Sequence, residues 1–368
     1  MSPLSLPDDL RPADGRFGSG PSKVRPAALA ALAATGPRYL GTSHRREGVR
    51  SVVRRVRHGI AALYGLPDGH EVVLGNGGAT AFWDAAAFRL VERRSLHYSF
   101  GEFSAKFAAV TTGAPFLDDP VVVTAPPGCH PDPVADGWVD AYALTHNETS
   151  TGVSMPVERP GGPGLVLVDG TSAAGAIPAD PASFDAYYFS PQKAFGSDGG
   201  LWVAMCSPAA LERIASIDRW TPRFLDLRAA VEQSRKDQTL NTPALATLFL
   251  LADQVDWLLA RGGLGWSAAR GRRAADLVYG WAEASEYAEP FVADPAMRST
   301  TVATVDLAAS VPAAGLTGAL RDNGIVDVEA YRGLARNQVR IGMWPAVDPE
   351  DLERLLAAID WLAERLGE

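Results

Sequence analysis

The sequence predicts an α/β fold, with a large domain built on a mostly parallel sheet covered by helices and a small C-terminal α+β domain. Apolar strand-like segments alternate with helical segments as far as residue 206, which is the pattern of a parallel sheet with helical crossovers. The chain is then mainly helical before it returns to mixed strands and helices. At 368 residues it is long for one core and suits a large domain with a smaller one.

We therefore expect three parts in the chain. Residues 1–16 form an extended N-terminal arm, residues 17–262 the large domain and residues 263–368 the small domain. The last boundary falls at the glycine pair Gly262-Gly263, which separates two long helical segments. Neither an internal repeat nor a low-complexity linker is visible.

Composition and charge narrow the class of protein. The hydrophobic fraction of 47% is that of an ordinary globular protein, and the net charge of −9 argues against a nucleic-acid or membrane partner. Cys129 and Cys206 are too few for a disulfide framework or a zinc cluster, so we expect no metal. The first residues carry no signal pattern, and no apolar run approaches the ~20 residues of a membrane span. We expect a cytoplasmic protein.

Helices are predicted from apolar periodicity and from prolines or small polar residues at their starts. The clearest runs from Val49 to Tyr64, where apolar residues recur on one face and the arginines lie mostly off it. The other helices are expected at 27–34, 79–91, 104–111, 208–217, 226–237, 243–260, 263–284, 315–323 and 349–366.

Strands are predicted from short apolar runs rich in valine, leucine and aromatic residues. In the large domain they are expected at 71–74, 95–100, 121–123, 141–144, 165–168, 185–189 and 201–206. In the small domain they are expected at 300–307, 325–328 and 337–342. A polar cluster, residues 145–152, follows one large-domain strand at its carboxyl end, where open parallel sheets bind ligands.

A glycine-rich turn joins the first strand to the helix expected at 79–91. In residues 75–80 (GNGGAT) the glycines allow close approach to the backbone, and free N–H groups meet the positive end of the helix dipole. The turn is therefore a candidate phosphate site, although many α/β proteins turn on glycines without binding one. It matches neither a P-loop nor a dinucleotide fingerprint.

The strongest chemical signal is a lysine downstream of a buried acid. Asp169 ends a buried strand, one further strand follows, and Lys193 lies in the next turn. Burial lowers the pKa of an ammonium and so favours the neutral, nucleophilic amine. Pyridoxal phosphate enzymes use this arrangement, in which the carboxylate pairs with the pyridinium nitrogen and the lysine forms the aldimine. A lysine on a surface hairpin is the alternative.

Other candidate site residues lie in loops or at the ends of strands. The ring of Phe103 could cover a planar cofactor or pack in the core. His44 and Arg45 precede a helix in a glycine- and serine-containing loop, where binding residues concentrate. The last loop and strand carry three arginines that could bind an anion or face solvent: Arg332, Arg336 and Arg340.

With these segments placed, the chain resembles the phosphoserine aminotransferase family in its actinobacterial form, from Arg16 to the last helix. The resemblance rests on the stretches 17–22 (FGSGPS), 42–45 (TSHR), 75–80 (GNGGAT), 146–149 (HNET), 190–193 (SPQK) and 241–243 (NTP). Each is weak alone, and their order and separation make the signal strong. The family consists of class-V, fold-type I pyridoxal-phosphate enzymes with a seven-stranded-type sheet. Its members are homodimers whose active sites lie at the subunit interface.

The resemblance implies a cofactor site. Lys193 would form the internal aldimine of pyridoxal 5′-phosphate and shuttle a proton, and Asp169 would keep the pyridine nitrogen protonated. Phe103 would stack on the ring, where many relatives have tryptophan. The other cofactor-binding residues would be Gly78, Ala79, Thr80 and Gln192 at the phosphate, Thr149 at the phenolic oxygen, and Asn241 and Thr242 reaching in from the other subunit.

The resemblance also implies a substrate site. Its residues would be Ser19, His44, Arg45, Arg332 and Arg340. Arg340 matches the arginine that takes the α-carboxylate with its planar fork. The pair at 44–45 matches residues that bind the distal carboxylate or phosphate, and Arg332 matches a basic residue from the partner subunit. Tyr331 stands where many relatives have histidine, and Arg336 could share the duty of Arg332.

The implied reaction is reversible amino transfer from L-glutamate to 3-phosphohydroxypyruvate, which gives O-phospho-L-serine and 2-oxoglutarate by a ping-pong route. This is a step of serine biosynthesis, with a second role in pyridoxine biosynthesis left open. An alanine- or serine-glyoxylate aminotransferase of the same fold is the first alternative, and it would not need the basic residues around a phosphate. A non-catalytic cofactor-binding regulator is the second. A cysteine desulfurase is disfavoured because residues 207–368 contain no cysteine.

Overall fold

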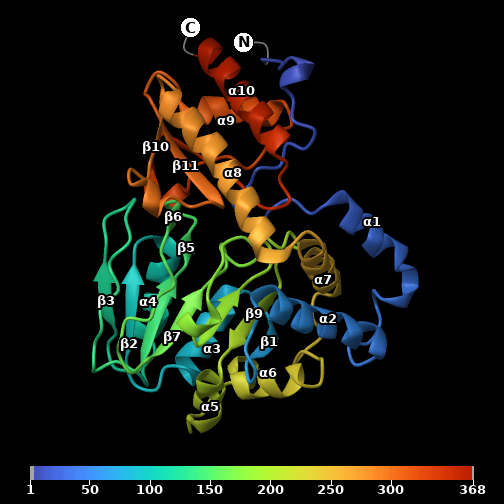
Figure 1. Cartoon of the computed structure of the whole chain (residues 1–368), viewed down its shortest axis with the longest axis vertical. Coiled ribbons are helices and arrows are strands. Elements are labelled where there is room, and N and C mark those ends of the chain that lie inside the picture. The colour runs from blue at the N-terminus through green and yellow to red at the C-terminus, as the bar shows by residue number, and fades with distance from the viewer. Residues whose placement is uncertain (1–3, 367–368) are drawn as a thin grey trace.

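The computed structural model describes residues 4–366, which form a large lower body and a smaller upper body in Figure 1. The large body is centred on a seven-stranded sheet in the order β1-β9-β8-β7-β4-β2-β3. Its strands are β1 (Glu71–Asn76), β2 (Ser95–Ser99), β3 (Val121–Thr124), β4 (Ala141–Thr145), β7 (Leu165–Asp169), β8 (Ala186–Phe189) and β9 (Leu201–Cys206). Only β9 runs antiparallel to its neighbours in this sheet. The predicted mostly parallel sheet is confirmed.

Helices cover both faces of the sheet because its strands are apolar on both sides. On one face Leu74 and its counterparts pack against α2 (Glu47–Tyr64) and α7 (Leu245–Ala260). On the other face, Val73 and the strand side chains that point the same way pack against α3 (Ala79–Arg89) and against the helices α4, α5 and α6, whose bounds follow. The large body also contains α1 (Pro26–Ala34), α4 (Glu102–Thr112), α5 (Pro208–Ser216) and α6 (Leu227–Ser234), with a short hairpin of β5 (Asn147–Glu148) and β6 (Val153–Ser154).

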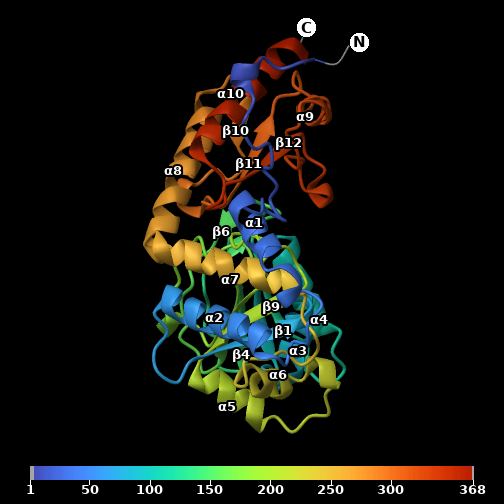
Figure 2. The same ribbon diagram turned by 90° about the vertical axis from the view of Figure 1, so that its right-hand side faces the viewer.

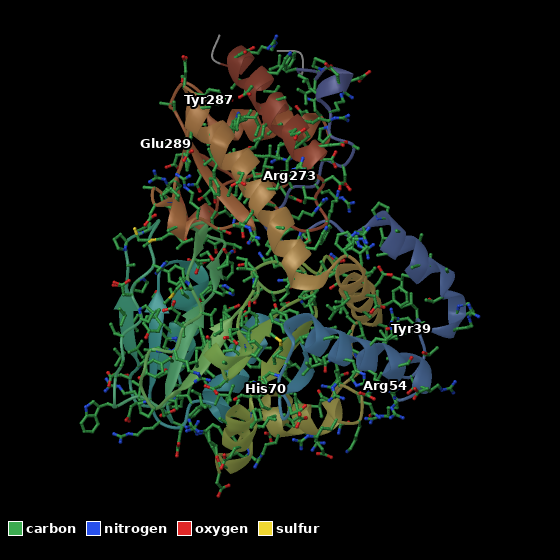
Figure 3. All side chains as sticks on the ribbon, in the orientation of Figure 1. Tyr39, Arg54, His70, Arg273, Tyr287 and Glu289 are labelled. Carbon is green, nitrogen blue, oxygen red and sulfur yellow. The ribbon has the colours of Figure 1, made fainter. Side chains whose placement is uncertain are left out.

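The arginines on the outer side of α2 are held by ion pairs as well as solvated. Arg54, labelled in Figure 3, pairs with Glu47 at 2.9 Å and with Asp237 at 2.8 Å. Nearby, Tyr39 lies between α1 and α2 and donates its hydroxyl to the carbonyl of Leu245 at 3.0 Å.

In the described residues, no helix has both the length and the apolar character that crossing a membrane requires.

The small body has its own apolar core. A three-stranded antiparallel sheet of β10 (Ala288–Pro290), β11 (Val302–Leu307) and β12 (Gln338–Gly342) packs against α8 (Gly263–Ala284), α9 (Ala313–Asp322) and α10 (Pro349–Leu366). The prediction of a strand at 325–328 is wrong. Val326 makes a single bridge to Arg16, and Asp327 adopts a positive φ of 65°, which interrupts an extended run.

The N-terminal arm is extended but not loose, because it packs along the small body (Figure 2). Leu6 is buried in the core of that body, and its N–H donates to Asn323 Oδ1 at 2.9 Å. The N–H of Ala13 donates to Asp351 Oδ1 at 2.7 Å. The buried amine of Lys23 also lies within 4 Å of several carboxylates, among them Asp351 at 3.8 Å. The chain then crosses to the large body at residues 17–22.

Candidate active site

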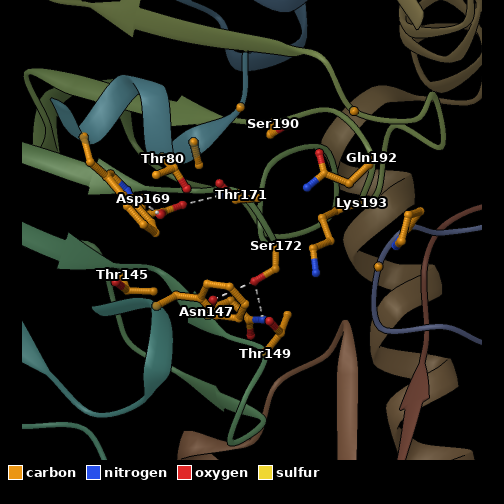
Figure 4. A pocket seen from close by; sticks show the side chains of 17 residues that line it. Thr80, Thr145, Asn147, Thr149, Asp169, Thr171, Ser172, Ser190, Gln192 and Lys193 are labelled. Atoms are coloured by element: carbon orange, nitrogen blue, oxygen red, sulfur yellow. Dashed lines mark hydrogen bonds between the residues drawn. The ribbon is translucent and has the colours of Figure 1, made fainter. Parts of the chain in front are cut away.

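A cavity of about 470 Å³ opens at the carboxyl ends of β4, β7 and β8, where the polar loops of the parallel strands meet (Figure 4). Predicted site residues that line it are Gly78, Ala79, Thr80, Phe103, Thr149, Asp169, Gln192 and Lys193. Figure 4 shows Asp169 and Lys193 on opposite sides of the cavity. The glycine turn, the 145–152 cluster and the lysine turn, which are far apart in sequence, are thus brought together.

Lys193 lies in the turn after β8, and its side chain is buried. Its Nζ donates to the carbonyl oxygen of Ser19 at 2.6 Å. Gly20, whose φ is 129°, passes so close that a Cβ there would collide with the lysine side chain. Burial, followed by the charge of Arg340, lowers the pKa of the Lys193 amine to about 8. A substantial fraction of the amine is therefore neutral near physiological pH.

This lowered pKa gives a pH dependence that can be measured on cofactor-free protein. Only the neutral amine attacks an aldehyde, so the rate of covalent pyridoxal phosphate attachment rises with pH and levels off above a midpoint near 8. A lysine exposed to water would give a midpoint near 10.4. Stopped-flow absorbance between pH 6.5 and 10 measures the midpoint, and a value near 10 would contradict a buried nucleophilic Lys193.

Asp169 is the last residue of β7 and is buried at the back of the cavity. Its Oδ1 accepts the N–H of Thr171 at 2.8 Å, and its Oδ2 accepts the indole N–H of Trp83 at 3.2 Å. Burial raises the pKa of this carboxyl, while the side chain and backbone of Thr171, the indole of Trp83 and the charge of Lys193 oppose the rise. The carboxylate thus has one protein donor on each oxygen and lone pairs left for a group in the cavity.

Phe103 is held at the start of α4 by a buried carboxylate. Glu148 Oε2 accepts the N–H groups of Phe103 and Ser104, each at 3.0 Å. Glu148 Oε1 accepts the hydroxyl of Ser150 at 2.7 Å. The first N–H groups of a helix have no intrahelical acceptor, so the carboxylate fixes the helix start and with it the backbone that carries the Phe103 ring. The edge of the Tyr331 ring contacts that ring, with centroids 6.1 Å apart.

We expect Glu148→Ala to lower the free energy of unfolding by about 3 kcal/mol, because buried N–H donors lose a charged acceptor. Cofactor affinity should fall as well, since the helix start that positions Phe103 loosens. Denaturant titration of the cofactor-free protein measures the first effect. Glu102→Ala, which removes a neighbouring exposed carboxylate paired with Lys106, should change stability by less than about 1 kcal/mol. Equal losses in both variants would refute this role of Glu148.

The part of the cavity wall at the start of α3 is suited to an anion. Gly78, Ala79 and Thr80 line the cavity where α3 begins, and no side chain caps the first N–H groups of that helix, so these groups are left for a ligand. Among the described residues, three polar atoms of the lining are buried without a hydrogen-bond partner: Asn147 Oδ1, Thr171 Oγ1 and Gln192 Oε1. Because buried polar atoms are rarely left unpaired, they indicate a polar ligand.

Two of the predicted substrate residues lie beside the cavity. Ser19 is buried, and its carbonyl holds Lys193. Arg340 on β12 donates to the carbonyl of Thr149 at 3.1 Å, and its guanidinium lies 5.3 Å from the centre of the Tyr331 ring. Arg336, in contrast, is ion-paired with Asp306 on β11 and stays away from the cavity. Arg332 is exposed in the loop before β12.

The remaining predicted residues do not reach this cavity in one chain. His44 Nδ1 and the hydroxyl of Thr242 are 3.0 Å apart, and Arg45 donates to Gln238 Oε1 at 3.1 Å. The amide of Asn76 donates to the carbonyl of Asn241 at 3.3 Å. Residues 44–45 and 241–242 therefore form one cluster, named here the outer cluster, which lies outside the lining.

Thr145 and Asn147 line the cavity as members of the predicted polar cluster 145–152, although neither was singled out as a site residue, and Ser190 lies in the 190–193 stretch. Three other lining residues were not predicted from the sequence: Trp83, Thr171 and Ser172. Ser172 donates to the carbonyl of Asn147 at 2.6 Å and accepts its amide at 2.9 Å, and Figure 4 shows this pair below the lysine. Their position directly after β4 and β7 was the available signal, because those strand ends meet at one edge. Trp83 had a weaker signal, one helical turn after Ala79 on α3.

Comparison with known proteins defines the class first. The aminotransferase class-V family model matches residues 135–355, so the fold and cavity are those of a class-V aminotransferase. A putative phosphoserine aminotransferase of Mycolicibacterium vanbaalenii is 58% identical over 99% of both chains, and the phosphoserine aminotransferase of Rhodococcus jostii is 56% identical over 98% of both. The crystal structure of a phosphoserine aminotransferase from Cytophaga hutchinsonii has the same fold, with a TM-score of 0.87 at 24% identity, and covers 95% of this chain and 99% of its own. This chain belongs to the phosphoserine aminotransferase family.

Enzymes of this class use pyridoxal phosphate. The cavity fits that group, because the unpartnered Thr171 and Gln192 oxygens and the start of α3 suit its phosphate and polar substituents. The buried carboxylate of Asp169 and the amine of Lys193, on opposite sides, suit its pyridine nitrogen and its aldehyde.

Proposed function

We propose that the chain transfers the amino group of L-glutamate to 3-phosphohydroxypyruvate, reversibly, giving O-phospho-L-serine and 2-oxoglutarate by a ping-pong route. The observation that carries the proposal is the 58% identity, over 99% of both chains, to a relative named a putative phosphoserine aminotransferase. The reaction belongs to serine biosynthesis. We also propose a cytoplasmic location and a second role in pyridoxine biosynthesis.

In this reaction the bound cofactor supplies an electron sink for the charge that develops at the substrate Cα. Lys193 Nζ removes and returns the Cα proton, and a pKa near 8 suits a general base at neutral pH. Asp169 holds the proton of the pyridine nitrogen in place. Phe103 covers the ring and excludes water. The phosphate is bound by Gly78, Ala79, Thr80 and Gln192, and Thr149 contacts the phenolic oxygen.

Arg340 is proposed to bind the substrate α-carboxylate. It is partly buried, and its guanidinium lies over the Tyr331 ring and donates to the carbonyls of Thr149 and Glu329. Its charge already acts on Lys193. A guanidinium held in this way loses little freedom when it forms two parallel hydrogen bonds. Ser19, whose carbonyl accepts the amine of Lys193, would contact the substrate on the same side.

The outer cluster supports a homodimer with shared active sites. His44, Arg45, Asn241 and Thr242 lie together outside the cavity of their own chain, so they can serve a cavity only across an interface. We propose that Asn241 and Thr242 contact the partner's cofactor phosphate. The pair at 44–45 and the exposed Arg332 would bind the distal carboxylate or phosphate of the substrate. The parts 1–16, 17–262 and 263–368 remain our proposed domain division, which the two separate apolar cores support.

A substrate panel tests the proposed function. Purified enzyme with cofactor and glutamate should use 3-phosphohydroxypyruvate far better than glyoxylate or pyruvate. In Arg45→Ala the KM for 3-phosphohydroxypyruvate should rise about tenfold or more, because a charge-assisted contact is worth about 1.5–3 kcal/mol. Arg55→Ala, which removes an exposed arginine paired with Asp256 on the outer side of α2, is the matched control. Equal or better use of glyoxylate would favour a glyoxylate aminotransferase instead.

A further inference from the structure

The further inference concerns Trp83 on α3, whose indole contacts Asp169. The indole is 3% exposed and lies parallel to the Phe107 ring, with centroids 6.0 Å apart and an interplanar angle of 14°. Its Nε1–H donates to Asp169 Oδ2 at 3.2 Å. Trp83 also lines the cavity. The side chain thus has an apolar body fixed in the core and one polar atom aimed at the carboxylate.

The alternative explanation for a buried tryptophan on a helix is that its side chain only packs in the core. Phenylalanine would fill much of the same space against Phe107 without a polar atom. An indole N–H in this place needs an acceptor, because an unpaired buried donor costs about 1–3 kcal/mol. The acceptor it finds is the carboxylate that faces the cavity. A tryptophan here therefore does something that an aromatic filler does not.

What the contact does follows from the surroundings of Asp169. The carboxyl is buried, and burial favours its neutral form, which could not hold a proton on a neighbouring nitrogen. Two N–H donors oppose this, and they come from different elements: the backbone of Thr171 after β7 and the indole of Trp83 on α3. With one oxygen bound by each donor, the plane of the carboxylate is fixed and its charge is favoured.

Trp83 also connects the two ends of the cavity. It follows Ala79 by four residues, so both lie on the same face of α3, one helical turn of about 5.4 Å apart. The start of that helix faces the proposed phosphate site, and the next turn carries the indole. One rigid helix can therefore set the phosphate end and the carboxylate end of the site relative to each other.

We propose that Trp83 is a positioning residue that holds Asp169 ionised and correctly oriented toward the pyridine nitrogen of the cofactor. This inference rests on the role given to Asp169 in the proposed function. It adds that the strength of the interaction between Asp169 and the pyridine nitrogen depends on the indole N–H of Trp83. A phenyl ring in the same place, which has no N–H, is not sufficient.

Trp83→Phe tests the inference, because it removes the N–H and keeps a ring against Phe107. Trp202→Phe is the matched control, since Trp202 is a buried tryptophan of the same apolar cluster that has no hydrogen bond to Asp169. Holoenzymes are prepared with cofactor labelled with ¹⁵N at the pyridine nitrogen. The ¹⁵N chemical shift and the single-turnover rate of Cα-proton removal are measured, together with the KM values and the cofactor Kd.

In Trp83→Phe we expect the ¹⁵N resonance to move toward the position of an unprotonated pyridine and the proton-removal rate to fall about tenfold. The KM values should stay within about twofold of the wild-type values, and any rise in the cofactor Kd should accompany the ¹⁵N shift, because both report the weaker pyridine interaction. Trp202→Phe should change none of these. A Trp83→Phe enzyme that matches the control in shift and rate overturns the inference. So does one that loses only cofactor affinity, because this would make Trp83 a packing residue.

Asp169→Asn separates a failure of this inference from a failure of the proposed function. If Asp169→Asn moves the ¹⁵N resonance and Trp83→Phe does not, only the role of Trp83 is wrong. If neither variant moves it, Asp169 does not pair with the pyridine nitrogen, and the proposed function loses that assignment as well.

Discussion

Lys193→Ala is expected to lower the turnover number by about 10³-fold or more, because the residue proposed to move the Cα proton is removed, and a positioned general base contributes about 10²–10⁴-fold. The visible absorbance of the covalent lysine–cofactor link should disappear at the same time. The fold should persist, since the Lys193 side chain is replaced at a cavity wall and its amine has one protein acceptor, the Ser19 carbonyl. Added cofactor and glutamate would therefore bind without efficient turnover.

Peptide mapping makes this test specific. The lysines of the chain are Lys23, Lys106, Lys193 and Lys236. Reduction of the holoenzyme with borohydride should place the cofactor on the peptide that contains Lys193. Lys236→Ala is the control, because Lys236 is exposed in the turn after α6 and forms an ion pair with Glu232 of that helix. A visible band that survives Lys193→Ala, or a label on Lys106 in the wild-type enzyme, would show that the wrong lysine has been assigned.

Asp169→Ala should slow Cα-proton removal by roughly 10²-fold, equivalent to about 3 kcal/mol of lost charge stabilisation in a water-excluded site. Deuterium at the substrate Cα should then give a larger isotope effect on turnover than in the wild-type enzyme, because proton removal becomes the slow step. Single-turnover measurements with protiated and deuterated glutamate test both statements.

Two substitutions at this position separate charge from shape. Asp169→Asn keeps an oxygen for the N–H of Thr171 or Trp83 but has no charge, and it should be nearly as slow as alanine. Asp169→Glu keeps the charge at a shifted position and should recover part of the rate. If Asn were as fast as the wild type, the negative charge would not contribute, and Asp169 would serve only in packing.

Much of the large domain could be predicted because its strands carry a strong local signal. Segments such as 165–168 and 201–206 are apolar at every position, which suits interior strands of a sheet covered by helices on both faces. The segment 325–328 carried a similar signal and formed no strand. There the left-handed backbone of Asp327 and the pairing of Val326 with the distant Arg16 decide the conformation, and neither is visible in local composition.

The candidate site was predictable where chemistry requires one residue type and hidden where it depends on a neighbour. Lys193 and Asp169 stand out because a buried ammonium and a buried carboxylate need a reason to be there. Trp83 does not, because a tryptophan on the apolar face of a helix is ordinary. Its function depends on Asp169 lying across from it, and that position is set only by the packing of α3 on the sheet.

The way in which the arm is held has a consequence for the synthesis of the chain on the ribosome. Residues 17 and 18 directly precede Ser19, whose carbonyl accepts the amine of Lys193. The carbonyl of Phe17 accepts the N–H of Gly342 at 2.7 Å, and the carbonyl of Gly18 accepts the indole N–H of Trp344 at 2.8 Å. These partners lie more than 300 residues later in sequence. The sheet of the large domain can assemble once residue 206 has emerged, whereas the arm must wait for the C-terminal part. The lysine therefore acquires its Ser19 partner only after β12 and Trp344 have been synthesised, and a nascent chain that stalls before β12 would hold a formed sheet with an open cavity.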